Sequence, residues 1–268
     1  MLQRTVSAAR RARVVLGQIC EYAVCDDATR YNPVREVQRL PLAEKKTSSP
    51  TPAQITSIRE FMQHWREKPA NKPRPDYRAI IDGMDIMLGT SARVEERIGL
   101  RRCDVDMTTA PPTVLIDGTI VQTKEHGITR KNSPKRTRQR RRVSLPALAA
   151  TAGRHRLALA DRSKDARMFA AKNGNSISVS NYERPLRSFI HNTTEELEKL
   201  GVRVGDFSTH IYRRTTATLV ERAVGLTLAS RLLGHASEQI TRTSYVVSAD
   251  EVDPITVQVL DGLLGNGP

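Results

Sequence analysis

The sequence predicts a mainly α-helical fold with a small antiparallel β-sheet, an α+β arrangement. Over most of the chain, apolar residues recur at three- and four-residue steps, which is the period of an amphipathic helix. Short stretches with strand-like patterns occur in the middle of the chain, at residues 113–116, 120–121 and 143–145. We therefore expect a helical domain with its small sheet near the beginning.

The first 45 residues predict a helix followed by a linker. Apolar residues between Val14 and Ala23 follow the helical period, and we expect the helix to stop at Asn32-Pro33. The residue before a proline is pushed out of the helical region, which explains that stop. Residues 39–50 are polar and contain prolines, as linkers do. We place a boundary near residue 45, which gives domains at 1–45 and 46–268.

The second domain opens with a helix-start signal. Thr51 can cap the helix, Pro52 suits its first position, and Gln54 completes a capping box. Apolar spacing predicts further helices around residues 55–65, 80–88 and 94–100. After residue 147 the chain is predicted to be mostly helical, ending in an amphipathic helix at 252–264.

The charge indicates a polyanionic partner. The chain has 43 Lys and Arg against 29 Asp and Glu, a net charge of +14. A surplus of this size favours DNA or RNA over a membrane surface. We find no apolar run of 18 residues and no signal peptide, so no membrane partner is expected.

Cysteine and histidine patterns predict neither a disulfide framework nor a metal site. The three cysteines include no Cys-x-x-Cys pair, and the six histidines have no metal-ligand spacing. A reducing cytoplasm suits such a chain, and we expect no metal or cofactor.

A basic run lies between two strand-like segments. Eight of the thirteen residues from 130 to 142 are Lys or Arg. Such runs are most often disordered tails or localisation signals, but this one ends directly in the alternating segment Val143–Pro146. We therefore expect a basic β-hairpin that lies against phosphates. The predicted DNA-contacting residues are Arg130, Lys131, Arg136, Arg138, Arg140, Arg141 and Arg142, together with Arg214 on a later helix.

Four short segments carry the candidate chemistry. The first is GTSARVEERIGLRRCDVD, which begins at residue 89, and the second is Pro134-Lys135-Arg136-Thr137. The last two lie in HIYRRTTATLVERAVGLTLASRLLGHASEQITRTSY, from His210 to Tyr245. Each motif alone is common: an Arg-x-x-Glu is usually a surface ion pair, and a Leu-Gly-His usually ends a helix. Their joint order and spacing resembles the tyrosine recombinase family of phage and mobile-element integrases.

That resemblance implies a tyrosine recombinase catalytic-domain fold and a set of catalytic residues. Tyr245 would attack a DNA phosphodiester and form a 3′-phosphotyrosine, without a cofactor. Glu96 would orient a neighbouring donor, and Lys131 is the alternative to Lys135 as general acid. The implied catalytic residues are Arg93, Lys135, His210, Arg213, His235 and Tyr245.

The sequence departs from the family pattern near these residues. Ser91 stands where the family usually has glycine, and Arg102 occupies a position that is often aromatic. Ile211 follows His210 where an acidic residue is frequent. These departures concern the backbone and the surroundings of the site, because each predicted catalytic group is present.

The resemblance also implies partners. Residues 1–45 are similar to the closing helices of the family's core-binding domain, and double-stranded DNA is the expected partner. We expect a monomer when free, a homotetramer on paired DNA sites, accessory DNA-bending or directionality proteins, and a bacterial cytoplasmic location. The helix at 252–264 would dock on a neighbouring protomer or fold onto its own domain. Two alternatives remain: a truncated or inactive relative that only binds DNA, and a type IB topoisomerase-like activity.

Overall fold

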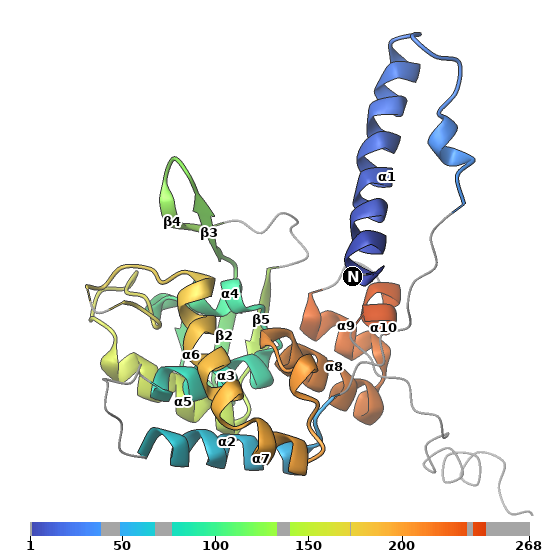
Figure 1. The fold of residues 1–268 in the computed structure, drawn as a ribbon. Helices are drawn as coiled ribbons and strands as arrows, with labels where there is room; N and C mark the ends of the chain where they lie inside the picture. Colours follow the sequence, from blue (N-terminus) through green and yellow to red (C-terminus); the bar gives the residue numbers. More distant parts are fainter. Residues whose placement is uncertain are drawn as a thin grey trace, which may run out of the picture. The chain divides into compact units, whose positions relative to one another are not determined.

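The computed structural model describes residues 2–38, 49–67, 77–132, 140–171, 173–234 and 238–244 (Figure 1). The chain divides into two compact units, residues 1–46 and 47–268. Within the described residues, no helix is long and apolar enough to cross a membrane. The predicted identity of the first unit as part of a core-binding domain stays a prediction.

The first unit consists of helix α1 (Leu2–Cys25) and the short 3₁₀ helix η1 (Pro33–Arg35). The amide of Asn32 joins them, because its Oδ1 accepts from Val34 N at 3.0 Å and its Nδ2 donates to Gly17 O at 2.9 Å. The prediction that the first helix runs to Asn32-Pro33 is wrong. The helix ends at Cys25, and Asp27 then takes a left-handed conformation, with φ of 53°, which turns the chain.

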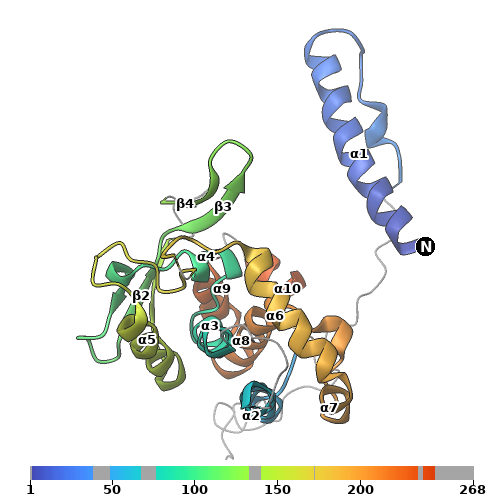
Figure 2. The same cartoon turned by 60° about the vertical axis from the view of Figure 1, so that its left-hand side comes forward.

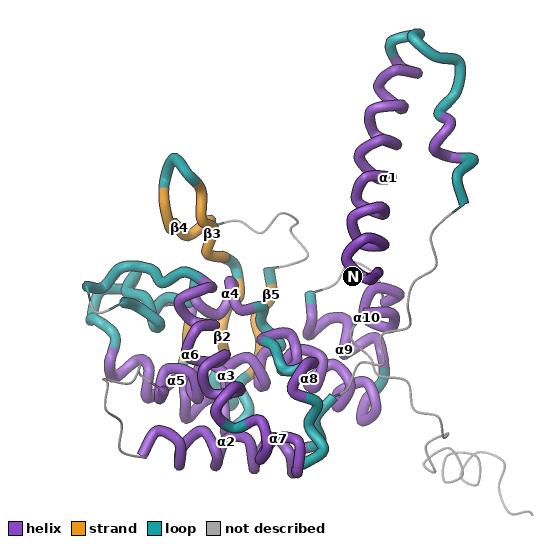
Figure 3. Tube along the Cα trace, in the orientation of Figure 1, coloured by secondary structure: helices purple, strands orange, loops and turns teal. Residues whose placement is uncertain are grey.

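The second unit is mainly helical, as predicted, and Figure 3 shows helices forming most of its described trace. Its helices are α2 (Pro52–Glu67), α3 (Tyr77–Thr90), α4 (Val94–Ile98), α5 (Ala147–Leu159), α6 (Val179–Asn192), α7 (Thr194–Lys199), α8 (Thr209–Val224), α9 (Leu226–Leu233) and α10 (Glu238–Ser244). Its strands are β1 (Val105–Asp106), β2 (Thr113–Ile116), β3 (Thr119–Thr123), β4 (Gly127–Lys131) and β5 (Arg141–Ser144). The 3₁₀ helices are η2 (Arg102–Asp104) and η4 (Val204–Asp206).

The predicted capping box at the start of α2 is confirmed. Gln54 N donates to Thr51 Oγ1 at 3.2 Å, and Thr51 N donates to Gln54 Oε1 at 2.8 Å. Each bond satisfies a backbone or side-chain group that a helix start would otherwise leave unpaired. The same Gln54 side chain donates to Leu200 O, which ties α2 to the segment after α7.

The strands form two separate antiparallel sheets among the described residues. One has the order β1-β2-β5, and the other is the hairpin β3-β4, which projects from the rest of the unit in both views (Figures 1 and 2). The predicted basic hairpin at residues 130–142 is therefore wrong, because β4 pairs with β3 while β5 pairs with β2. Val143 faces the core opposite Val114, and this apolar contact sets the pairing of β5. Residues 133–139 lie outside the described residues.

Helix α3 lies at the centre of the second unit. It packs against α2, α5, α6 and α8 and is buried along most of its length. Gly89 allows the close approach of α5, since a Cβ at this position would lie 2.5 Å from the Cβ of Ala149. The chain leaves α3 at Thr90 and enters α4 four residues later. This connection carries the first arginine motif, so a buried helix at the centre of the domain anchors it.

Candidate active site

Arg93 occupies the N-cap of α4, in extended conformation. Glu96, three residues later, accepts a hydrogen bond from Arg93 N at 2.9 Å and another from Arg93 Nη1 at 3.0 Å. This is the glutamate half of a capping box, which fixes both the backbone and the side chain of the arginine. The Arg93 side chain keeps 29% of its surface exposed, so it remains accessible to a ligand.

Glu96 also binds an arginine from a distant strand. Its Oε2 accepts from Arg141 Nη2, on β5, at 2.9 Å. Burial alone raises the pKa of the Glu96 carboxyl, but the Arg141 and Arg93 charges outweigh burial, so this pKa lies below its ordinary value of 4.5. Glu96 is therefore ionised at neutral pH. These contacts hold the Arg93 and Arg141 side chains, and the role of Glu96 in orienting a catalytic donor stays a prediction.

Arg213, on α8, is buried and joins two chain segments. Its Nη1 donates to the carbonyl oxygen of Ser91, and its Nη2 donates to the carbonyl oxygen of Leu233. Ser91 lies two residues before Arg93, and Leu233 lies two residues before His235. One guanidinium thus connects the first arginine motif to the end of the Leu-Gly-His motif.

The turn after α9 lies next to Arg141. Gly234 is left-handed, with φ of 64°, and ends the helix as the sequence motif predicts. A Cβ at Gly234 would lie 3.1 Å from Arg141 Nη1. Arg141 therefore extends from Glu96 to the residue just before His235. The sequence predicts that Arg141 contacts DNA. The alternating pattern of β5 could not indicate its ion pair with Glu96, because that carboxylate lies 45 positions earlier in the sequence.

The remaining predicted catalytic residues fall into two groups. His210 is exposed in the first turn of α8, three residues before Arg213. At this spacing the two side chains leave the helix on the same side. Lys135, His235 and Tyr245 lie outside the described residues, and so do Arg136 and Arg138 of the predicted DNA contacts. Helix α10 ends at Ser244, next to Tyr245, and packs against α9.

The predicted DNA-contacting arginines do not share one environment. Arg130 was expected to bind DNA, but its side chain is 3% exposed and forms ion pairs with Asp104 and Asp117. Its Nε also donates to Gly99 O at 2.8 Å, so Arg130 anchors the β3-β4 hairpin to the end of α4 and does not face solvent. Arg141 is held by Glu96 as described. Lys131, Arg140 and Arg142 are exposed, and Arg214 is half-buried.

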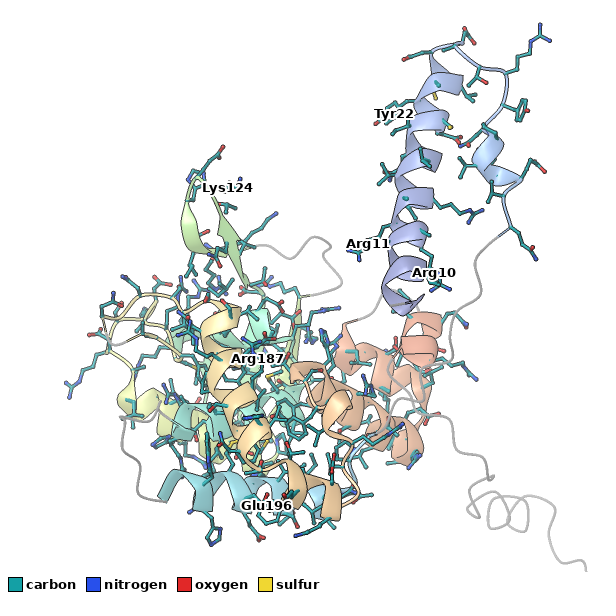
Figure 4. The ribbon with its side chains drawn as sticks, viewed as in Figure 1. Arg10, Arg11, Tyr22, Lys124, Arg187 and Glu196 are labelled. Atoms are coloured by element: carbon teal, nitrogen blue, oxygen red, sulfur yellow. The ribbon has the colours of Figure 1, made fainter. Side chains whose placement is uncertain are left out.

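Lys124 is an exposed cation that the sequence did not single out as a DNA contact. Lys124 lies in the turn of the β3-β4 hairpin and points away from the domain (Figure 4). The preceding segment Thr119–Thr123 was the available signal, because four of its five residues are β-branched and it pairs with Gly127–Lys131 across a three-residue turn.

Known proteins of one family share this chain's sequence pattern and fold. Residues 51–251 match the Phage integrase family, so the chain belongs to that family of tyrosine recombinases. None of the curated protein sequences matches the chain.

Solved structures share the fold at low sequence identity. The Tn1549 transposon integrase in complex with a circular intermediate DNA superposes with a TM-score of 0.76 and 18% identity, over 97% of this chain and 79% of that one. A lambda integrase dimer bound to a COC′ core site gives 0.57 and 14%, over 94% and 77%. The XerH recombinase bound to its palindromic difH substrate gives 0.52 and 17%, over 74% and 49%. At these identities, the likeness establishes the fold.

Ser91 carries backbone strain beside the site. Its φ is 54°, in the left-handed region, and its buried Oγ has no hydrogen-bond partner among the described residues. We expect Ser91→Gly to raise the free energy of unfolding by about 1 kcal/mol, because glycine adopts this conformation without strain. Ser91→Ala removes the hydroxyl and keeps the strain, so it separates the two effects. Urea denaturation measures both variants, and a less stable glycine variant would contradict this account.

The low pKa of Glu96 gives a pH-dependent prediction. A carboxyl whose pKa is depressed by folding contributes stability above its unfolded pKa and loses it as the pH falls through the folded pKa. We expect Glu96→Gln to lower the free energy of unfolding by about 2 kcal/mol at pH 7. This difference should shrink as the pH falls below the ordinary pKa of 4.5 and vanish only below the lowered pKa of Glu96 in the folded protein. Glu95→Gln, one residue earlier on the same helix, is the control. A pH-independent difference at Glu96 would show that its charge is not involved.

Proposed function

We propose that this chain is a site-specific recombinase or integrase that breaks and rejoins DNA strands through a 3′-phosphotyrosine at Tyr245. The observation that carries the proposal is the position of Arg213. Its guanidinium binds the segment before Arg93 and the segment before His235 at once. This arrangement supports a single site to which Arg93, Arg213, His235 and Tyr245 all belong.

The proposed reaction makes defined demands on these residues. A phenol has a pKa near 10, so attack by Tyr245 needs cationic donors at the phosphate. Arg93 and Arg213 suit this role, because a guanidinium stays charged and offers forked donors to phosphate oxygens. His235 adds a further donor. Donors that are fixed before the reaction stabilise the negative charge that develops on the phosphate.

The proton transfers require an acid and a base. In the forward step the Tyr245 oxygen bonds to phosphorus, and the bond from phosphorus to the 5′-oxygen breaks. Lys135 donates a proton to the leaving 5′-oxygen, with Lys131 as the alternative donor, and His210 accepts the proton of the phenol. A 5′-hydroxyl from a second strand reverses these steps and releases the tyrosine, so no external energy source or cofactor is needed.

DNA binding follows from the surface charge. Lys131, Arg140 and Arg142 are exposed on or beside the two sheets, and Lys124 is exposed in the hairpin turn. With Arg136, Arg138 and Arg214 they supply cations for phosphates along a duplex. The Tn1549, lambda and XerH structures named above contain DNA, which supports the same partner for this chain.

The proposal extends to assembly and location. Recombination joins two duplexes, so we propose a tetramer on paired DNA sites and a monomer in its absence, in a bacterial cytoplasm and with accessory DNA-bending or directionality proteins. Residues 252–264, outside the described residues, would link neighbouring protomers or fold onto their own domain.

The test is covalent trapping on nicked duplexes cut from DNA that flanks the gene for this protein. A nick lets the short 5′-hydroxyl fragment diffuse away, so even slow cleavage accumulates. We expect a protein–DNA adduct on a denaturing gel for the wild type and none for Tyr245→Phe, which loses the nucleophile and keeps the ring. Specific binding to these duplexes with no adduct would contradict the proposal and support a module that only binds DNA.

A further inference from the structure

Arg97 is a fully buried charge outside the catalytic set. It lies on α4, and none of its three guanidinium nitrogens has a hydrogen-bond partner among the described residues. Buried polar groups are nearly always hydrogen-bonded, and a buried charge is costly without compensation. Another interaction must therefore stabilise the buried charge of Arg97.

Two aromatic rings enclose the Arg97 guanidinium. Its Cζ lies 3.8 Å from the centre of the Tyr182 ring, on α6, and 4.2 Å from the centre of the Phe169 ring. Aromatic faces are electron-rich and attract a cation, most strongly when water is excluded. Gly83, on α3, leaves the necessary space, since a Cβ there would lie 2.8 Å from Arg97 Nη1. The rings and the glycine together form a slot that fits a flat guanidinium.

Two buried phenols lie near this slot. The hydroxyls of Tyr182 and Tyr212 are buried and, among the described residues, have no hydrogen-bond partner. Burial lowers the pKa of Arg97 to about 10, and both phenols oppose that shift. The guanidinium therefore stays charged at neutral pH. It lies against two π faces, and no carboxylate among the described residues is bonded to it.

The position of Arg97 connects it to both arginine motifs. Helix α4 has only five residues, and Arg97 follows Arg93 by one turn, with a backbone bond from Arg97 N to Arg93 O at 2.9 Å. A helix this short is not stable by itself and takes its orientation from its side-chain anchors. On α8, Tyr212 directly precedes Arg213. The cluster thus includes a residue of the helix that Arg93 caps and a residue of the helix that carries Arg213.

We infer that Arg97 is a positioning residue for the proposed strand cleavage: by stacking between Phe169 and Tyr182, it fixes the rotation of α4 and so the direction in which Arg93, held by Glu96, meets the phosphate. This inference rests on the proposed function. An apolar side chain of similar volume would fill the slot without the cost of a buried charge, and such replacements are often neutral or stabilising. A charge kept at this cost beside a candidate site indicates a role in that site.

The test compares Arg97→Met with the wild type. Methionine matches the unbranched shape of arginine and removes the charge. We expect the urea midpoint of Arg97→Met to equal or exceed that of the wild type, while single-turnover cleavage of the nicked duplex falls about 10- to 100-fold, since small misplacement of a catalytic group has effects of this size. Affinity for the duplex should stay within about twofold. A purely structural residue would not combine unchanged or higher stability with slower chemistry.

The matched control is Arg156→Met. Arg156 is also a buried arginine near Phe169, with its Cζ 4.9 Å from the ring centre, but it lies on α5, and its Nε donates to Met168 O. We expect its loss to change stability without slowing cleavage by a folded protein. Arg97→Lys is the second variant and covers the case in which the methionine variant does not fold. It keeps the charge and loses the planar stack, so cleavage should fall here too.

Cleavage at the wild-type rate by a folded Arg97→Met or Arg97→Lys would overturn the inference. A loss of cleavage that only parallels a loss of stability would overturn it as well. If the wild type forms no adduct, the proposed function is contradicted, and the cleavage assay cannot test the role of Arg97. Hydrogen exchange in the free protein then tests whether Arg97 holds α4 in place. The amides of Arg97 and Gly99, which bond to Arg93 O and Glu95 O, should exchange faster in both Arg97 variants and not in Arg156→Met.

Discussion

The buried guanidinium of Arg213 is the interaction on which the candidate site depends. It donates to the backbone carbonyls of Ser91 and Leu233, which are 142 positions apart in the sequence. A charged donor in a buried site is strongly favoured only when acceptors are fixed around it, and the carbonyls would be left unpaired without it. The left-handed backbone at Ser91 and the helix end at Gly234 are both positioned by this contact. The geometry of the candidate site and the local packing therefore depend on the same guanidinium.

Buried carboxylates organise the other arginines of this strongly basic chain. Glu96 holds Arg93 and Arg141 together, and Asp104 binds Arg101 while it also contacts Arg130. These pairs divide the cations into those that build the site and those that stay exposed on the surface. The second group is available to steer and hold the phosphates along a DNA duplex, whereas Arg93 and Arg213 are proposed to hold the single phosphate that is cleaved. Arg97 belongs to neither group, because aromatic rings hold it.

Local signals predicted much of the fold, and distant contacts account for the failures. Thr51 and Gln54 were predictable as a helix start because a capping box spans only four residues. The pairing of β5 depends on Val143 facing Val114, so the sequence of the basic run could not indicate it. The order of motifs indicated Arg93, Glu96 and Arg213. The burial of Arg97 was not predictable, because Phe169 and Tyr182 come from segments more than 70 positions later.

An experimental structure of the protein trapped on a nicked duplex tests the central claim most directly, namely that one phosphate is held by both arginine motifs and attacked from the segment after α10. The account predicts a covalent bond from Tyr245 to the 3′-phosphate. It also predicts that guanidinium nitrogens of Arg93 and Arg213 each lie about 2.7–3.2 Å from oxygens of that same phosphate. A phosphate bound to another residue, or one that either arginine does not reach, would contradict it.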